Sequence, residues 1–208
     1  MKTKLFFIFI LLLPFSVSAQ KATIGPAFSF LLSNNSQFDF SSFDNKRASI
    51  SYGINYSKQI STKFFLETGF QYLAQGAQYK SCLAFPEGEE HNIVIKRDYL
   101  IIPLNLMYGI GSTNNWKLSL GLYGAYNVKA IQDYPEPIGG CNRGYPRDIT
   151  GNTERFYLGF STGIYYIVFS NELFEINLGV DYFKNLTQIN AFVNNNSFGL
   201  DAKFNLKL

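Results

Sequence analysis

Apolar and polar residues alternate along most of this chain. In the last eleven residues, from Phe198 to Leu208, every second residue is apolar and the residues between them are small or polar. Residues 173–184 follow the same rule, with Phe174 and Val180 on the apolar side. Successive side chains of a β-strand point to opposite faces, so each segment predicts a strand with one apolar and one polar face.

Breaks between the alternating runs divide the chain into eight predicted strands. Their bounds are roughly Ala22 to Leu32, Arg47 to Gln59, Lys63 to Tyr79, Val94 to Ile110, Trp116 to Ala130, Arg155 to Val168, Leu173 to Lys184 and Asn196 to Leu208. Strands of soluble proteins average about five or six residues. A strand that crosses a membrane at about 45° needs roughly ten, and these strands reach that length.

The connections between these strands are alternately long and short. The long ones are 33–46, 80–93, 131–154 and 185–195, and the short ones are 60–62, 111–115 and 169–172. Outer-membrane barrels have long external loops, short periplasmic turns and an even number of strands, and the last strand must close on the first. We therefore predict an all-β fold, an eight-stranded antiparallel up-and-down transmembrane β-barrel. A secreted soluble β-barrel or sandwich is the alternative architecture.

Aromatic residues near the predicted strand ends fit this fold. Tyrosine and tryptophan are enriched at both interfaces of a membrane. The candidates for such girdles are Tyr56, Tyr72, Tyr108, Trp116, Tyr126, Tyr166 and Tyr182.

The first residues predict export. Lys2 and Lys4 precede an apolar run, 5–13, and small residues end at Ala19, which is the pattern of a cleaved secretory signal peptide. The run spans about 13 Å as a helix, too short for a hydrocarbon core of roughly 30 Å. We expect a signal peptide at 1–19, a barrel domain at 20–208 and an outer-membrane location. No cysteine at the junction offers a lipoprotein attachment point.

Composition supports a membrane solvent and excludes several classes of protein. Aromatic residues make up 17% of the chain and charged residues only 16%, whereas soluble proteins carry about 25% charged residues. Loss of Lys2 and Lys4 lowers the formal net charge from +3 to +1, so the chain lacks the clustered positive charge of a nucleic-acid-binding protein. Two cysteines are too few for a disulfide-built mini-protein or a four-cysteine zinc module.

One segment resembles a known family. The predicted fourth strand contains Tyr99-Leu100, Pro103-Leu104 and Tyr108. With the signal peptide and the eight strands, this segment resembles the PorT-like outer-membrane β-barrel family of Bacteroidetes. The resemblance implies a small outer-membrane barrel, in a family that includes members tied to protein secretion. The chain departs from many such barrels because it ends in Leu208 and not in an aromatic residue.

The polar face of the strands carries charges that we expect inside the barrel, whose interior is just wide enough to be filled by side chains. The expected inward set is Glu67, Gln71, Arg97, Asn105, Lys117, Lys129, Glu175, Asp181, Asp201, Lys203 and Lys207. We predict a lumenal polar network of Glu67, Arg97, Glu175, Asp181 and Lys203, with Glu175 opposite Lys203 as an ion pair. The network is interpreted as a structural plug, and a path for protons or small ions is the alternative.

Cys82 and Cys141 both lie in predicted external loops. An even number of cysteines in an exported chain favours a disulfide, which would tie the second and third long loops together. Two free thiols or pairing with a partner are the alternatives.

His91 is the only histidine of the chain. It follows an acidic segment, Glu87 to Glu90, in a predicted external loop, and we interpret this segment as solvated, with no metal or cofactor bound. An outer-membrane hydrolase acting on lipid or peptide would have to use His91. The expected function is therefore a monomeric, non-enzymatic barrel. It contacts outer-membrane lipid, and its external loops meet another envelope protein or an extracellular ligand.

Overall fold

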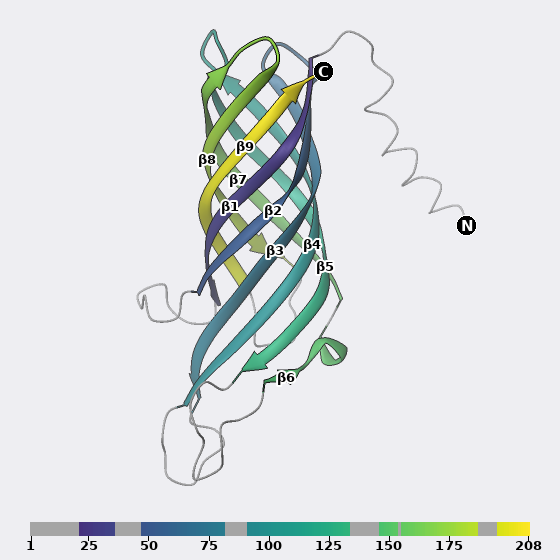
Figure 1. Ribbon diagram of the computed structural model, residues 1–208, viewed down its shortest axis with the longest axis vertical. Coiled ribbons are helices and arrows are strands. Elements are labelled where there is room, and N and C mark those ends of the chain that lie inside the picture. The colour runs from purple at the N-terminus through teal and green to yellow at the C-terminus, as the bar shows by residue number, and fades with distance from the viewer. Residues whose placement is uncertain (1–20, 36–46, 82–90, 134–145, 154, 187–194) are drawn as a thin grey trace, which may run out of the picture.

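The computed structural model describes residues 21–35, 47–81, 91–133, 146–153, 155–186 and 195–208, and in this part of the chain eight long strands form a closed antiparallel barrel (Figure 1). The eight strands are β1 (Ala22–Asn35), β2 (Arg47–Gln59), β3 (Phe64–Ser81), β4 (His91–Ile110), β5 (Trp116–Asp133), β7 (Phe156–Ser170), β8 (Phe174–Asn185) and β9 (Asn195–Lys207). The predicted fold is confirmed.

The last strand closes the barrel on the first. β9 pairs with β1 from Lys207 opposite Thr23 to Asn195 opposite Asn35, and β4 pairs with β5 on the far side. Lipid cannot hydrogen-bond the backbone N–H and C=O groups of an open strand edge. Closure pairs these groups of β1 with those of β9. In each of the other pairs of neighbouring long strands, β4 and β5 included, the two strands follow one another along the sequence.

The alternation in sequence becomes a division between lipid and lumen. Along β4, side chains from Ile101 to Gly109 are buried at odd positions, and those from Ile102 to Ile110 are exposed at even positions. On β5, Leu120 is 65% exposed, whereas the neighbouring Ser119 is buried. The apolar face therefore points outward. Among the described residues no helix is long and apolar enough to span a membrane.

Two belts of paired aromatic rings bound this apolar face. On the side of the short turns, Trp116 packs against Tyr166, and towards the long loops Tyr126 packs against Phe156. Strand residues advance about 3.4 Å each, and a tilt of about 45° makes the rise from Trp116 to Tyr126 about 24 Å. This height matches an outer-membrane apolar band of about 25 Å.

Three adjacent strands continue beyond the belt on the loop side. β3, β4 and β5 extend further than the other strands (Figure 1). A short strand, β6 (Arg147–Asp148), adds to the edge of β5 and is followed by a 3-10 turn, η3 (Thr150–Asn152). The Thr150 hydroxyl accepts a hydrogen bond from the Ala130 N–H at 2.8 Å, which holds the turn on β5. Both elements lie inside the predicted loop 131–154.

A bulge in β5 changes which face its last residues occupy. The register with β4 shifts between Asp98 and Tyr99, which pair with Lys129 and Asn127. Val128 is the extra residue, so Val128 and Lys129 are both exposed and Ala130 points inward. The expectation that Lys129 faces the lumen was wrong, because a bulge reverses the alternation and its position depends on pairing with the neighbouring strand.

Candidate functional site

The half of the lumen nearest the short turns contains a charged network centred on Lys203 of β9. The Lys203 Nζ atom lies 2.8 Å from Glu67 Oε1 and 3.6 Å from Asp201 Oδ2. All three side chains are almost completely buried. Buried charges are tolerated when they are paired and hydrogen-bonded, and this arrangement satisfies that condition.

Tyr165 and Asp181 extend the network across β7 and β8. The Tyr165 hydroxyl donates a hydrogen bond to Asp181 Oδ1, and Lys203 Nζ lies 3.9 Å from the centroid of the Tyr165 ring. Gly179 provides the space, since a Cβ atom there would lie 2.3 Å from Tyr165 Cδ1. An alternating small and large pattern across neighbouring strands thus allows a tyrosine to fit inside the barrel.

A second ion pair lies nearer the short turns. Lys117 Nζ of β5 is 2.8 Å from Glu175 Oε1 of β8, and Asn177 Nδ2 donates to the same oxygen at 2.8 Å. The predicted pair between Glu175 and Lys203 is therefore wrong. In the register of β8 and β9, Lys203 lies opposite Asn177, and the two lysines find carboxylates across the lumen on other strands.

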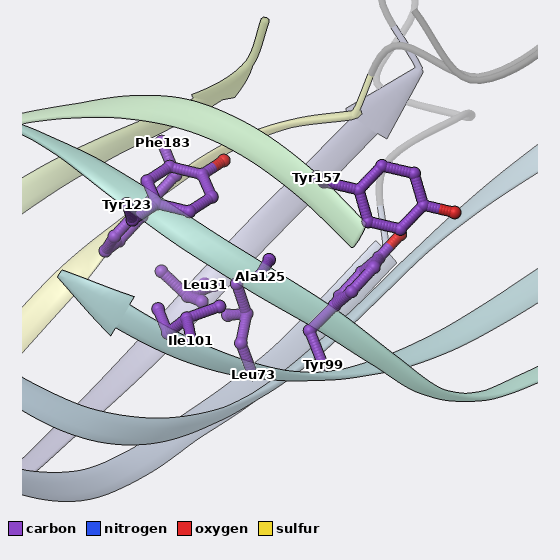
Figure 2. Close-up of a cluster of buried hydrophobic side chains, with 8 residues drawn as sticks. All are labelled: Leu31, Leu73, Tyr99, Ile101, Tyr123, Ala125, Tyr157 and Phe183. Atoms are coloured by element: carbon purple, nitrogen blue, oxygen red, sulfur yellow. The ribbon is translucent and has the colours of Figure 1, made fainter. Parts of the chain in front are cut away.

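A layer of apolar and aromatic side chains fills the lumen on the loop side of the charged network (Figure 2). Tyr99 and Tyr157 meet edge to face with centroids 5.6 Å apart, and Tyr123 and Phe183 meet in the same way at 5.8 Å. Figure 2 draws the complete layer, which consists of Leu31, Leu73, Tyr99, Ile101, Tyr123, Ala125, Tyr157 and Phe183. We call this set the aromatic layer.

Arg97 is the one buried charged side chain on the loop side of the aromatic layer in the described residues. It precedes Tyr99 on the inward face of β4 and is only 4% exposed. Its Nε and Nη1 atoms have no hydrogen-bond partner within the described chain. Gln75, which lies opposite Arg97 on β3, donates from Nε2 to Ser197 Oγ at 2.7 Å.

The match to known families covers most of the chain. Residues 18–191 match the family model for the outer membrane protein beta-barrel domain. The chain belongs to this family. Its members are barrels of the outer membrane, and the exposed apolar face between the aromatic belts contacts outer-membrane lipid.

The fold of this chain is similar to solved structures of other outer-membrane barrels. Neisserial surface protein A is 15% identical, with a TM-score of 0.50, and the match covers 90% of this chain and 97% of that one. Ail of Yersinia pestis, solved with the heparin analogue sucrose octasulfate, is 11% identical, with a TM-score of 0.47 and coverages of 89% and 98%. OprG of Pseudomonas aeruginosa is 14% identical, with a TM-score of 0.45 and coverages of 91% and 96%. None of the curated proteins matches this chain.

The predicted lumenal residues do not form one network but occupy different places in the barrel. Glu67, Asp181 and Lys203 come together, Glu175 pairs separately with Lys117, and Arg97 lies beyond the aromatic layer. Lys207, expected to point inward, is half-buried at the turn end. Its Nζ atom donates to Ser170 Oγ at 2.7 Å.

Several predicted features fall on residues that the structure does not describe. The signal peptide at 1–19, the acidic segment 87–90, and both Cys82 and Cys141 lie outside the described residues. His91 is the first residue of β4 and pairs in register with Ser81 of β3. In the described part of the chain, no three His, Cys, Asp or Glu residues are grouped as a metal site would need.

Proposed function

We propose that this barrel is a non-conducting, non-enzymatic outer-membrane protein that presents its loop side to another envelope protein or to an extracellular ligand. The observation that carries the proposal is the uneven height of the barrel. β3, β4 and β5, with β6 at the edge, rise beyond the aromatic belt as one continuous sheet (Figure 1). A rigid sheet above the membrane can hold binding loops in a fixed position at a low cost in conformational entropy.

The outer face of this extension differs in chemistry from the lipid-facing band below it. Lys96 of β4 and Asp133 of β5 form an ion pair of 3.0 Å, and Lys129 is exposed beside them on β5. Charged side chains are costly against lipid and ordinary in water. Their position supports the proposal that this part of the sheet is in contact with the aqueous exterior and with whatever binds there.

Photo-crosslinking in intact cells tests the proposed binding side. A photoreactive p-benzoylphenylalanine replaces Lys129 on the extension in one strain, and replaces the exposed Lys63 at a short turn in the matched control. We expect a discrete adduct with one envelope protein from position 129 that position 63 does not give. If position 129 yields no adduct, or the same adducts as position 63, the loop side is not the binding side.

Conductance measurements test the filled lumen. The aromatic layer and the two ion pairs lie in series along the lumen, and an eight-stranded barrel leaves little room beyond its side chains. Purified protein in a planar lipid bilayer should give no stepwise channel currents. Regular current steps from the wild-type protein would support the alternative of an ion path.

The hydrolase alternative depends on His91. The register opposite Ser81 is the one backbone observation in its favour, because a nucleophile and a base must lie within hydrogen-bond reach. A His91→Ala variant separates the alternatives, since it should leave crosslinking from position 129 intact. Loss of a lipid- or peptide-hydrolysing activity in that variant would instead establish an enzyme.

We also propose that the chain is a member of the PorT-like family. The segment behind it places Tyr99 and Pro103 on the inward face of β4, and Leu104 on the lipid-facing side. The Thr68 hydroxyl donates to the Pro103 carbonyl at 2.8 Å, beside the position where proline cannot donate to the ladder. An adduct from position 129 with a component of a secretion machine would support this assignment.

A further inference from the structure

Arg97 is a buried cation whose guanidinium is not neutralised by the described residues around it. Its Nε and Nη1 atoms are buried and bond to nothing in the described chain. Its register partners are Gln75 on β3 and Ala130 on β5, neither of which is charged. A guanidinium removed from water is strongly destabilised unless an acceptor meets its N–H groups.

The other buried charges of the lumen cannot serve Arg97. The carboxylates of Glu67, Glu175, Asp181 and Asp201 all lie on the short-turn side of the aromatic layer. They are already engaged there with Lys117, Lys203, Tyr165 and Ser29. Among the described residues, the aromatic layer thus separates the buried acids from Arg97, the one buried cation on the loop side.

The described acids of the loop side are engaged elsewhere. Asp133 accepts from Lys96 at 3.0 Å, and Asp148 is exposed and accepts from the Thr150 N–H at 2.8 Å. Asp98 is the next residue after Arg97, so its side chain points to the opposite face of β4, beside Tyr72. No described carboxylate therefore offers an acceptor to Arg97.

We propose that Arg97 binds the anionic group of an external ligand, a carboxylate or a phosphate, on the loop side of the aromatic layer. The planar guanidinium presents several N–H donors in fixed directions and stays charged at any physiological pH. Arg97 is buried and precedes Tyr99 of the aromatic layer on the inward face of β4, and a buried site of low dielectric strengthens a contact between opposite charges. The inference concerns a small-anion site inside the barrel and goes beyond the proposed binding at the loops.

Nuclear magnetic resonance of the intact barrel tests the site directly. Protein carrying 15N-labelled arginine is purified in octyl glucoside, which contains no phosphate or carboxylate. Sodium phosphate or sodium acetate is added at constant ionic strength, with sodium chloride as the reference salt. The Arg97 Nε–Hε signal, assigned by its absence in Arg97→Gln, should shift with saturation in phosphate, acetate or both, and not in chloride. The anion that saturates identifies the ligand class.

A matched variant and a stability measurement complete the test. Arg147→Gln removes an exposed arginine of β6 and should leave the Arg97 titration unchanged. Phosphate or acetate should raise the urea midpoint of wild-type unfolding, and this increase should be lost in Arg97→Gln. If Arg97→Gln fails to fold, Arg97→Lys replaces it for the assignment of the Arg97 signal. The wild-type titration then still shows whether that signal responds to phosphate or acetate.

One result would overturn the proposal: a wild-type Arg97 signal that responds to neither phosphate nor acetate. Replacement of Glu87, Glu89 and Glu90 by glutamine then gives the reason. A change in the Arg97 signal of that variant would mean that Arg97 pairs with an acid of its own chain.

Discussion

The two halves of the lumen differ in whether their buried cations are paired with carboxylates. On the short-turn side, Lys117 and Lys203 each lie 2.8 Å from a carboxylate. On the loop side, Arg97 lies beyond the aromatic layer and has no described carboxylate beside it. The strands that build both halves are the same, so the difference lies in the side chains alone.

This difference separates a structural role from a binding role. Mutually paired charges hold strands together and leave nothing for a ligand to satisfy. An unpaired cation adds no such stability and keeps its donors available. The comparison therefore predicts that substitutions on the short-turn side affect stability, and that substitution of Arg97 affects ligand response.

The largest effect is expected from Lys203→Met. This change leaves Glu67 and Asp201 buried without their cation, which should lower the free energy of unfolding by about 3–5 kcal/mol. Urea unfolding in phospholipid vesicles, followed by the fluorescence of Trp116, the single tryptophan, measures it. The exposed Lys129→Met is the control and should change stability by no more than about 0.5 kcal/mol. Equal losses of unfolding free energy in Lys203→Met and Lys129→Met would mean that the buried ion pair has no special role in stability.

Gly179→Ala should have the next largest effect. The added Cβ atom would lie 2.3 Å from Tyr165 Cδ1 and 2.6 Å from the Ile164 carbonyl oxygen, so Tyr165 must move away from Asp181. We expect a loss of about 1–3 kcal/mol by the same unfolding measurement. Gly124→Ala meets nothing within 4 Å and should be close to neutral. A neutral Gly179→Ala would show that the network tolerates displacement of Tyr165.

The pairing of Lys117 with Glu175 can be measured by a double-mutant cycle. Lys117→Met, Glu175→Gln and the double variant should give a coupling energy of about 0.5–3 kcal/mol. Arg97→Met combined with Glu175→Gln provides the reference, because the aromatic layer lies between these residues and their effects should add. Additive effects for the first pair would contradict the ion pair.

Arg97→Met should have the smallest effect on stability. In buffer without phosphate or carboxylate, the free energy of unfolding should stay the same or rise by about 1 kcal/mol, because the variant removes a desolvated charge and keeps the volume. Urea unfolding of Arg97→Met and of Lys203→Met, both in octyl glucoside because phospholipid headgroups carry phosphate, gives the comparison. A loss as large as that of Lys203→Met would mean that Arg97 has a structural partner in its own chain.

The strand pattern in the sequence was sufficient to predict the barrel. β2 spans Arg47–Gln59, as predicted, and the other seven strands differ from their predicted bounds at one or both ends. Lipid contact imposes a strict period of two and long strands, so the signal is strong in every segment. The extra elements β6 and η3 were missed because Arg147–Asp148 is too short to show any alternation.

Candidate lumenal residues were easier to predict than their partners. The side of the strand on which Glu67, Glu175 and Lys203 lie follows from counting by two along each strand. Which carboxylate meets which lysine depends on contacts across the lumen between strands that are not neighbours, and no pattern within one strand contains that information. The isolation of Arg97 likewise became visible only once the aromatic layer was placed between it and the acids.

The sequence by itself determined the solvent of each face and the number of long strands, because these depend on local alternation and on breaks between segments. The tertiary structure decided the ion pairs, the bulge that turns Lys129 outward and the separation of Arg97 from the buried acids. These features depend on register and on distances across the lumen, which form only when β9 closes the barrel on β1.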